Sequence, residues 1–279
     1  MIDSVKLIDG VKCYALDLAY QNDGFPRDAF EKLYHKEEKN FWFRSRNRII
    51  RFLVNKYLRT DAGKMQSFLE IGCGTGFVLK GLSSLGYLRL VGADIYLEGL
   101  KYLKQRVPEA EAVQVDATKL PFENEFAAVG AFDALEHIND DQQVIKGVYR
   151  ALKPEGYFFL TVPQHQFLWS RVDEIACHKR RYLREDLVTV LKGTGFHIEF
   201  VGSFLFLLFP VMLVSRLMQK WLASLECSSP VNEFNSSRLL NGLFEQMTRI
   251  DEWLIRLGVS LPFGGSLVVI CKKVRGQDL

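Results

Sequence analysis

A short glycine-rich turn between an apolar run and an amphipathic stretch constrains the fold of this chain most strongly. The run Ser67–Ile71 is typical of a buried strand, three alternating glycines follow it, and a helix is predicted over Phe77–Leu85. Glycine lacks a Cβ atom, so this turn can adopt unusual dihedral angles and let a ligand approach the backbone directly. The first helical turn also offers unpaired N–H donors. The pattern predicts a ligand site at the carboxyl end of this strand, although many such turns use glycine for packing alone.

The same alternation of apolar runs and amphipathic stretches continues along the chain. Further strands are predicted over 89–93, 112–115, 126–132, 157–162 and 197–201. A helical stretch then precedes a last apolar strand, Gly264–Lys273. The predicted fold class is α/β, a doubly wound Rossmann-like sheet of about seven mostly parallel strands. We expect residues 1–279 to form a single domain with an N-terminal helical cap (1–65), a cofactor-binding core (66–202), a helical insertion (203–262), and the last strand with its tail (263–279).

Composition excludes several classes of protein. The 279 residues include 36 Lys and Arg against 33 Asp and Glu, and a formal charge of +3 is too small and too evenly spread to predict a nucleic-acid partner. Five widely spaced cysteines without a Cys-x-x-Cys pair predict neither a disulfide framework nor a zinc site, and they favour a reducing compartment. Charged residues interrupt the first ten positions, so no signal-peptide core is expected there. We therefore expect a cytoplasmic protein.

The spacing and surroundings of the glycines favour one class of ligand. A dinucleotide fingerprint needs Gly-x-Gly-x-x-Gly, whereas here the third glycine, Gly76, comes one residue too early. Glu70 directly precedes the turn, where a carboxylate would repel a pyrophosphate and attract the ammonium and sulfonium charges of S-adenosylmethionine. Asp94, after the second strand, can bind ribose hydroxyls in either ligand. Asp116 and the backbone N–H of Ala117 can bind adenine, although a solvated turn acid is an equal alternative for Asp116.

Taken together, these motifs resemble the ordered motifs of class I S-adenosylmethionine-dependent methyltransferases. The matching residues are Leu69–Gly76, Asp94, Asp116, Phe132–His137 and, before the fifth strand, Leu152–Phe158. The resemblance covers roughly residues 40–273. It implies S-adenosyl-L-methionine as the cofactor and a last strand that lies antiparallel to its neighbours.

Flanking segments make the resemblance closest to a bacterial subgroup similar to the quinone-pathway methyltransferases. The segments that carry this closer resemblance are Phe41–Arg44, which lies before the core, and His178–Tyr182, which lies after the fifth strand. The chain departs from the family where Ala127 replaces the usual aspartate of the fourth strand, so Asp133 is expected to take the cofactor-side position. The predicted cofactor-binding residues are Glu70, Gly72, Cys73, Gly74, Gly76, Asp94, Ile95, Asp116, Ala117 and Asp133.

Methyl transfer from a sulfonium is an in-line displacement, so the protein must align the acceptor and, for a hydroxyl acceptor, remove a proton. Open sheets place such groups at the carboxyl ends of their strands. The resemblance makes His137 the first candidate for a general base, with Glu136 and His165 as further catalytic candidates; a capping or packing role is the alternative for His137. Asp133, Glu136 and His137 could also offer ligands to a divalent ion, but three visible donors are too few, and no metal site is predicted.

The acceptor side of the chain is apolar and locally basic. Phe200–Ser215 carries no charge but is shorter than the ~20 residues of a spanning helix, and Pro210 interrupts it. A buried helix or a homodimer surface is the first interpretation, and peripheral contact with the inner membrane through 203–221 is the alternative. The basic run His178–Arg181 suits an anionic group on the acceptor, or forms a solvated face.

The resulting prediction is a methyltransferase that acts on a small-molecule or lipid- or glycan-linked acceptor. Two other classes of protein remain open at this point. An NAD-dependent oxidoreductase would share the strand and the ribose-binding acid. A non-catalytic, membrane-associated cofactor-binding protein would account for Ala127 and for the apolar insertion.

Overall fold

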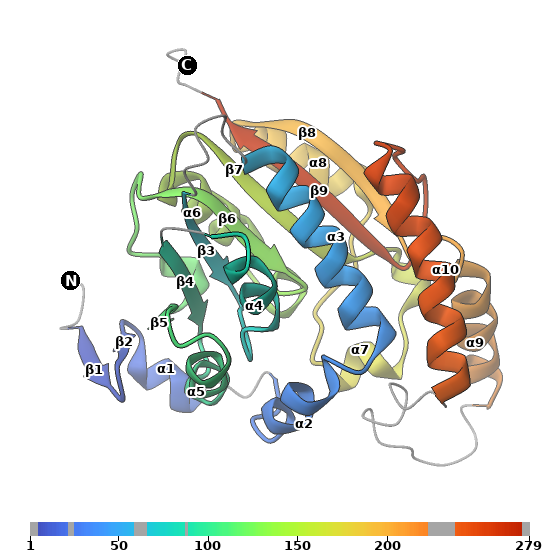
Figure 1. Ribbon diagram of the computed structural model, residues 1–279, viewed down its shortest axis with the longest axis horizontal. Helices are drawn as coiled ribbons and strands as arrows, with labels where there is room; N and C mark the ends of the chain where they lie inside the picture. Colours follow the sequence, from blue (N-terminus) through green and yellow to red (C-terminus); the bar gives the residue numbers. More distant parts are fainter. Residues whose placement is uncertain (1–4, 22–24, 59–65, 87–88, 223–237, 275–279) are drawn as a thin grey trace.

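The computed structural model describes residues 5–21, 25–58, 66–86, 89–222 and 238–274 (Figure 1). One nine-stranded sheet forms the centre, in the order β1-β2-β5-β4-β3-β6-β7-β9-β8. The strands are β1 (Lys6–Ile8), β2 (Val11–Cys13), β3 (Ser67–Ile71), β4 (Arg89–Asp94), β5 (Glu111–Gln114), β6 (Phe126–Phe132), β7 (Leu152–Pro163), β8 (Phe196–Phe204) and β9 (Ser266–Lys273). The five strands from β5 to β7 in this order are parallel, which confirms the predicted doubly wound α/β class.

The last strand lies between two earlier ones. β9 pairs antiparallel with both β7 and β8, as the family resemblance implied. Successive side chains of β9 pack into the buried clusters on opposite faces of the sheet, because side chains alternate between the two faces of a strand. Leu267 and Val269 belong to one buried cluster, whereas Val268 and Ile270 belong to the other. A continuous apolar run is the expected sequence of a strand that is covered on both faces.

Helices cover both faces of the sheet. On one face lie α3 (Phe41–Leu58), α4 (Phe77–Ser83) and α5 (Leu97–Arg106), whose apolar residues join one buried cluster. On the other face lie α6 (Asp141–Ala151) and α8 (Arg184–Gly193), whose apolar residues join the second cluster (Figure 1). The molecule therefore has three layers, as expected for a parallel sheet with buried strands.

The N-terminal part differs from the predicted helical cap. Besides α1 (Leu16–Gln21), α2 (Ala29–Lys36) and α3, it contains β1 and β2, which extend the sheet beyond the predicted seven strands. β2 pairs in parallel with the edge strand β5, and β1 folds back against β2. Each of these strands has only three residues and carries a lysine, so the sequence shows no apolar run there.

The predicted insertion contains two helices, α9 (Phe209–Leu222) and α10 (Arg238–Arg256). Residues 223–237, which include Cys227, lie outside the described part, as do the side chains of Lys220 and Trp221. α10 packs along α3, and Figure 1 shows α9 and α10 on the side of the molecule opposite β1 and β2. Among the described helices, none is long and apolar enough to span a bilayer.

Candidate functional site

A cavity of about 1250 Å³ lies at the carboxyl ends of the parallel strands. Its walls include the last residues of β3, β4 and β6, the glycine turn, the cap helix α2 and parts of α9 and α10. Typical sites for one small molecule have volumes of roughly 300–1,000 Å³. The cavity is therefore large enough for a cofactor and an acceptor side by side.

The glycine turn forms one end of this cavity. Gly72, Gly74 and Gly76 have φ angles of 67°, 50° and 76°, in the left-handed region that glycine adopts without strain. A Cβ atom on Gly72 would lie 2.5 Å from the Cβ of Ala134, so the turn and the loop after β6 touch. The backbone N–H groups of Gly72 and Cys73 both donate to the carbonyl oxygen of Ala93, which ties the turn to β4.

Two acidic residues surround the turn. The Glu70 side chain is fully buried, and its Oε2 atom has no hydrogen-bond partner among the described residues. Burial raises the pKa of Glu70 well above its ordinary value. Asp94 accepts hydrogen bonds from the backbone N–H groups of Gly74 (2.8 Å) and Tyr96 (3.0 Å), although burial raises its pKa. Asp94 thus shapes the turn, and Glu70 offers an unpaired acceptor to a cationic ligand.

The adenine-side residues also reach the cavity. Asp116 and Ala117 follow β5 and line the cavity, as does Ile95 after β4. Asp116 caps a short helical turn through its Oδ1 atom, which accepts hydrogen bonds from the backbone N–H and the hydroxyl of Thr118. The structure therefore brings Glu70, Gly72, Cys73, Gly74, Asp94, Ile95, Asp116, Ala117 and Asp133 to one cavity, whereas Gly76 is not among the described residues that line it and packs against Leu103.

Asp133 belongs to a buried ion pair that the sequence analysis missed. Arg46 of α3 donates to Asp133 Oδ2 at 2.6 Å, and the Thr161 hydroxyl donates to the same oxygen at 2.9 Å. The Arg46 guanidinium also lies over the Trp42 ring, 4.5 Å from its centroid. The signal was an arginine on the buried face of an amphipathic helix, where an unpaired charge is not expected.

Strained backbone conformations cluster around the cavity. Asp133, Cys177 and Leu205 line the cavity and have φ angles of 54°, 58° and 62°, which non-glycine residues rarely adopt. Each costs on the order of 1–3 kcal/mol and persists only where the surrounding structure requires it. Such clusters are common at active sites and ligand clamps, which agrees with a functional role for this region.

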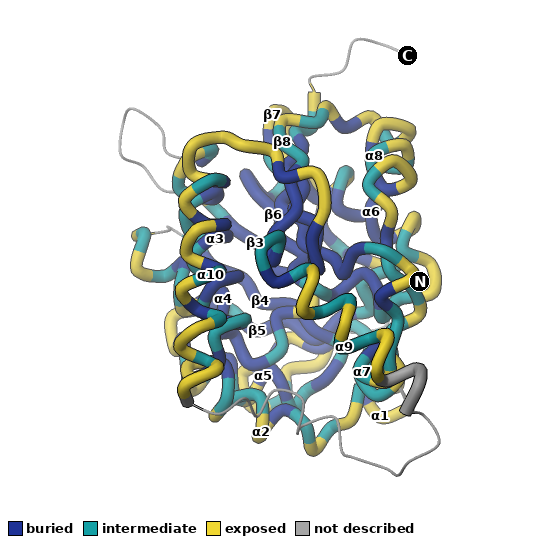
Figure 2. The backbone as a smooth tube through the Cα atoms, turned by 90° about the vertical axis from the view of Figure 1, so that its right-hand side faces the viewer, coloured by how far each residue is buried: buried dark blue, intermediate teal, exposed yellow. Residues whose placement is uncertain are grey.

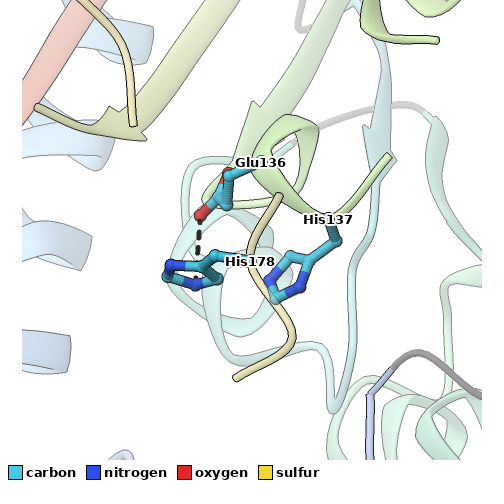
Figure 3. A group of neighbouring side chains, drawn as sticks. All are labelled: Glu136, His137 and His178. Atoms are coloured by element: carbon cyan, nitrogen blue, oxygen red, sulfur yellow. Dashed lines mark ion pairs between the residues drawn. The ribbon is translucent and has the colours of Figure 1, made fainter. Parts of the chain in front are cut away.

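Glu136 and His137, which line the same cavity, meet His178 from a distant segment of the chain (Figure 3). His178 Nε2 lies 3.9 Å from Glu136 Oε1, and the His137 and His178 ring centroids are 4.8 Å apart. The Lys179 backbone N–H donates to the Glu136 carbonyl oxygen at 2.6 Å, which joins the two segments. Both carboxylate oxygens of Glu136 are buried without a hydrogen-bond partner in the described structure, and burial raises the pKa of Glu136 well above its ordinary value.

The orientation of His178 is fixed by Asp173. His178 Nδ1 and Asp173 Oδ1 are 2.8 Å apart. Hydrogen bonds from His178 and Arg181 outweigh burial and lower the pKa of Asp173 to about 2, so this carboxylate is ionised and can only accept. Nδ1 of His178 therefore carries a proton and donates it to Asp173, and Nε2 faces Glu136. Sequence analysis assigned His178 to a basic patch and did not single out Asp173.

The histidines predicted as catalytic have different environments. His137 lines the cavity, and burial, together with the charge of His178, lowers its pKa to about 4. His165 is not among the described residues that line the cavity; it stacks on Phe167, with ring centroids 4.9 Å apart. Burial and the nearby Arg181 lower the pKa of His165. The structure thus brings together Glu136 and His137 but not His165.

Glu136, His137 and His178 each offer one atom that could bind a metal ion, and these atoms lie within 4.8 Å of one another. Two imidazoles and a carboxylate suit a first-row transition metal, but distances of about 2.0–2.2 Å to one ion would require a closer approach of the ligands. Asp133, the other ligand considered from sequence, is held by Arg46. The absence of a metal site stays a prediction.

The predicted basic patch is largely neutralised within the protein. Arg181 pairs with Asp173, Arg180 with Asp141, and Arg184 donates to the Leu261 carbonyl oxygen. Lys179 is exposed and lines the cavity. An anionic group on the acceptor would therefore meet Lys179 rather than a cluster of free arginines.

Asp173 should contribute strongly to stability. Replacing Asp173 by Ala leaves Arg181 buried without its carboxylate, and we expect the free energy of unfolding at pH 7 to fall by about 3 kcal/mol in urea titrations. Because the folded pKa is lowered to about 2, the contribution is present above the unfolded pKa of roughly 3.9 and is lost as the pH falls through 2. Glu109→Ala, which removes an exposed carboxylate, is the control; an equal loss in both variants would contradict the assignment.

Comparison with known proteins agrees with this geometry. Residues 69–160 match the family model described as a methyltransferase domain. A curated protein of Mycolicibacterium smegmatis, named "Probable S-adenosylmethionine-dependent methyltransferase", is 25% identical over 165 residues, which cover 58% of this chain and 62% of that protein. The chain thus spans less than two thirds of that relative's length.

Solved structures share the fold at lower identity. One chain of the complex of the Haloferax volcanii Trm112 methyltransferase activator with its methyltransferase superposes with a TM-score of 0.58 at 16% identity, covering 91% of this chain and 99% of that chain. Phosphoethanolamine N-methyltransferase 2 of Haemonchus contortus, solved with S-adenosyl-L-methionine, gives 0.52 at 21% identity, covering 80% and 51%. Residues 69–160 are thus similar to a methyltransferase domain, the chain is similar to a relative named as an S-adenosylmethionine-dependent methyltransferase, and the solved methyltransferases share its fold.

Proposed function

We propose that this protein transfers the methyl group of S-adenosylmethionine to an oxygen, nitrogen or carbon atom of a small-molecule or lipid-linked acceptor. The observation that carries the proposal is the buried Glu70 carboxyl, whose Oε2 atom has no hydrogen-bond partner among the described residues, beside three left-handed glycines. A pyrophosphate would be repelled there, whereas a cationic methionine end supplies the missing partner. The proposed cofactor contacts are those predicted from sequence, with Asp94 and Asp116 on the ribose and adenine sides.

Bound S-adenosylmethionine would supply an electrophilic methyl group, so the protein's own residues need only position and deprotonate the acceptor. Arg46 and Thr161 hold Asp133 at the carboxyl end of β6, which fixes the loop that carries Glu136 and His137. Glu136 is fully buried in this region, and its low local dielectric would strengthen the electrostatic interactions around it.

We propose His178 as the general base, positioned by Asp173. With Nδ1 donating to Asp173, the neutral imidazole would accept a proton at Nε2, and Asp173 would stabilise the imidazolium that forms, as in other carboxylate–histidine pairs. The pKa of His137 is about 4, so this histidine would hold a transferred proton only weakly at neutral pH. Glu136 lies beside His178, and its carboxylate would help to stabilise the positive charge of the imidazolium. The roles of His137, Glu136 and His165 stay predictions from sequence.

The acceptor end of the cavity is mostly apolar. Leu205, Leu208, Val211 and Met212 line it, together with Phe244 of α10. These side chains fit a hydrocarbon chain or an aromatic ring better than a sugar, and they favour a lipid-linked acceptor. The quinone-pathway subgroup, peripheral membrane contact through 203–221 and a homodimer remain predictions.

Calorimetry tests the proposal and its pH dependence. Because burial raises the pKa of Glu70, its carboxyl must lose a proton when a cation binds, so the affinity for S-adenosylmethionine should rise with pH from the acidic side towards neutrality. Glu70→Gln should bind about tenfold more weakly at pH 7.5 and with little dependence on pH. Glu109→Gln is the control. Tight binding of NAD and none of S-adenosylmethionine would replace this proposal with a dehydrogenase.

A further inference from the structure

α10 exposes a stripe of apolar residues, although Phe244, Met247 and Ile255 of the same helix pack against the core. Leu239, Leu243, Ile250, Trp253 and Leu257, at spacings of three, four and seven residues, form one stripe along the helix and its C-terminal end. Each of these side chains is at least half exposed, and Leu239 reaches 87%. An ordinary surface helix presents polar residues on the side that faces away from the core, whereas α10 presents this stripe there. We call these five residues the α10 stripe.

Buried ion pairs fix this orientation. Arg44 and Arg48 of α3 bind Glu245 of α10, and Arg48 also binds Glu252 with distances of 2.6–3.0 Å. Asp251 is buried on the same helix and accepts a hydrogen bond from the Phe206 backbone N–H at 2.6 Å. Rotating α10 to bury its stripe would leave these charges without partners, which is costly. The exposure of the stripe is therefore imposed by the fold.

α9 adds a second exposed apolar face. Val211, Val214, Leu217 and Met218 recur at helical spacing and are each about half exposed. Figure 2 shows exposed segments along both α9 and α10. Val211 also lines the cavity, so this face continues into the proposed acceptor end. A molecule that covers α9 would therefore border the cavity at Val211.

The charges on these helices indicate what covers them. Among the described side chains of α9 and α10, the acidic residues Glu245, Asp251 and Glu252 are buried, whereas Arg249 and Arg256 are exposed. Arg249 retains a 3.9 Å contact to Glu245 but remains more than half exposed. An exposed apolar stripe beside arginines complements anionic lipid headgroups over acyl chains. A second copy would bring its own arginines to the same face.

We propose that the exposed faces of α9 and α10 dock on the surface of an anionic lipid bilayer. Resting on the proposed function, this contact would let a lipid-linked acceptor pass from the bilayer into the cavity past Val211 without crossing water. The occupant is the lipid surface itself, and the helices lie in the plane of the interface rather than spanning it.

Vesicle flotation tests the docking. The full-length protein should float with phosphatidylcholine vesicles that contain phosphatidylglycerol and much less with pure phosphatidylcholine. Leu243→Gln combined with Trp253→Gln should lower the partition coefficient by about tenfold or more, because two apolar side chains no longer enter the interface. Arg249→Gln should reduce the preference for anionic vesicles about fivefold. The control is Leu7→Gln, which changes an equally exposed apolar residue on β1.

Three results would contradict the docking proposal. Wild-type protein that stays unbound, or a double variant that floats as well as the wild type, contradicts it. A wild-type dimer in light scattering that the double substitution dissociates would show that the face joins two copies instead. Calorimetry with S-adenosylhomocysteine on the same samples separates the docking proposal from the proposed function. Cofactor binding without flotation would contradict only the docking, and flotation without cofactor binding would contradict only the proposed function.

Discussion

Replacing His178 by Ala should lower kcat for methyl transfer to a hydroxyl acceptor by about 10²- to 10⁴-fold, the usual contribution of a positioned base. The Kd for S-adenosylhomocysteine should stay within about twofold, since His178 is not one of the proposed cofactor contacts. Release of S-adenosylhomocysteine with lipid extracts as the source of acceptor provides the assay. Added imidazole should restore part of the rate, which a purely structural role for His178 would not allow.

Matched variants separate His178 from its neighbours. His197→Ala removes an exposed histidine on β8 and should leave kcat unchanged. Asp173→Asn should also lower kcat, because the amide no longer holds the proton on Nδ1. If His137→Ala abolished turnover and His178→Ala did not, the base would be His137, as the sequence first suggested.

Gly72→Ala should weaken binding of S-adenosylhomocysteine by about 100-fold or more. An alanine at φ 67° is strained by roughly 1–2 kcal/mol. Its Cβ would also lie 2.5 Å from Ala134 and displace the loop that carries Asp133. Both effects act where the ligand contacts the backbone, so affinity falls more than stability does. Calorimetry measures the first quantity and urea unfolding the second.

A glycine in open space is the matched control. Gly193 in α8 has no atom within 4 Å of its would-be Cβ and no positive φ, so Gly193→Ala should bind the ligand normally and gain up to about 1 kcal/mol of stability. Unchanged affinity in a folded Gly72→Ala variant would show that the turn does not hold the cofactor.

Local sequence was sufficient to predict the sheet and the cofactor side of the cavity. Glu70 follows the apolar residues Phe68 and Leu69 near the end of β3, and Asp94 ends β4. Because the carboxyl ends of parallel strands meet at one edge of the sheet, a residue at the end of such a strand is expected to lie at the site. The antiparallel last strand followed from the family resemblance rather than from its composition. Short strands such as β1 had no periodic signal to detect.

The catalytic side could not be predicted in the same way. Glu136 and His178 meet because a loop after β7 returns to the end of β6, and no local pattern encodes that approach. Asp173 lies five residues before His178 on a short helix, and its importance depends on burial, which the sequence does not show. The orientation of α10 could not be predicted from local sequence either, because its ion-pair partners Arg44 and Arg48 are about two hundred residues away in the chain.

A single continuous cavity of about 1250 Å³ has a practical consequence for ligand design. One molecule that joins an adenosyl head to a hydrophobic tail could fill both halves at once. Linking the two parts makes the second contact intramolecular, so such a bisubstrate compound should bind orders of magnitude more tightly than either fragment alone.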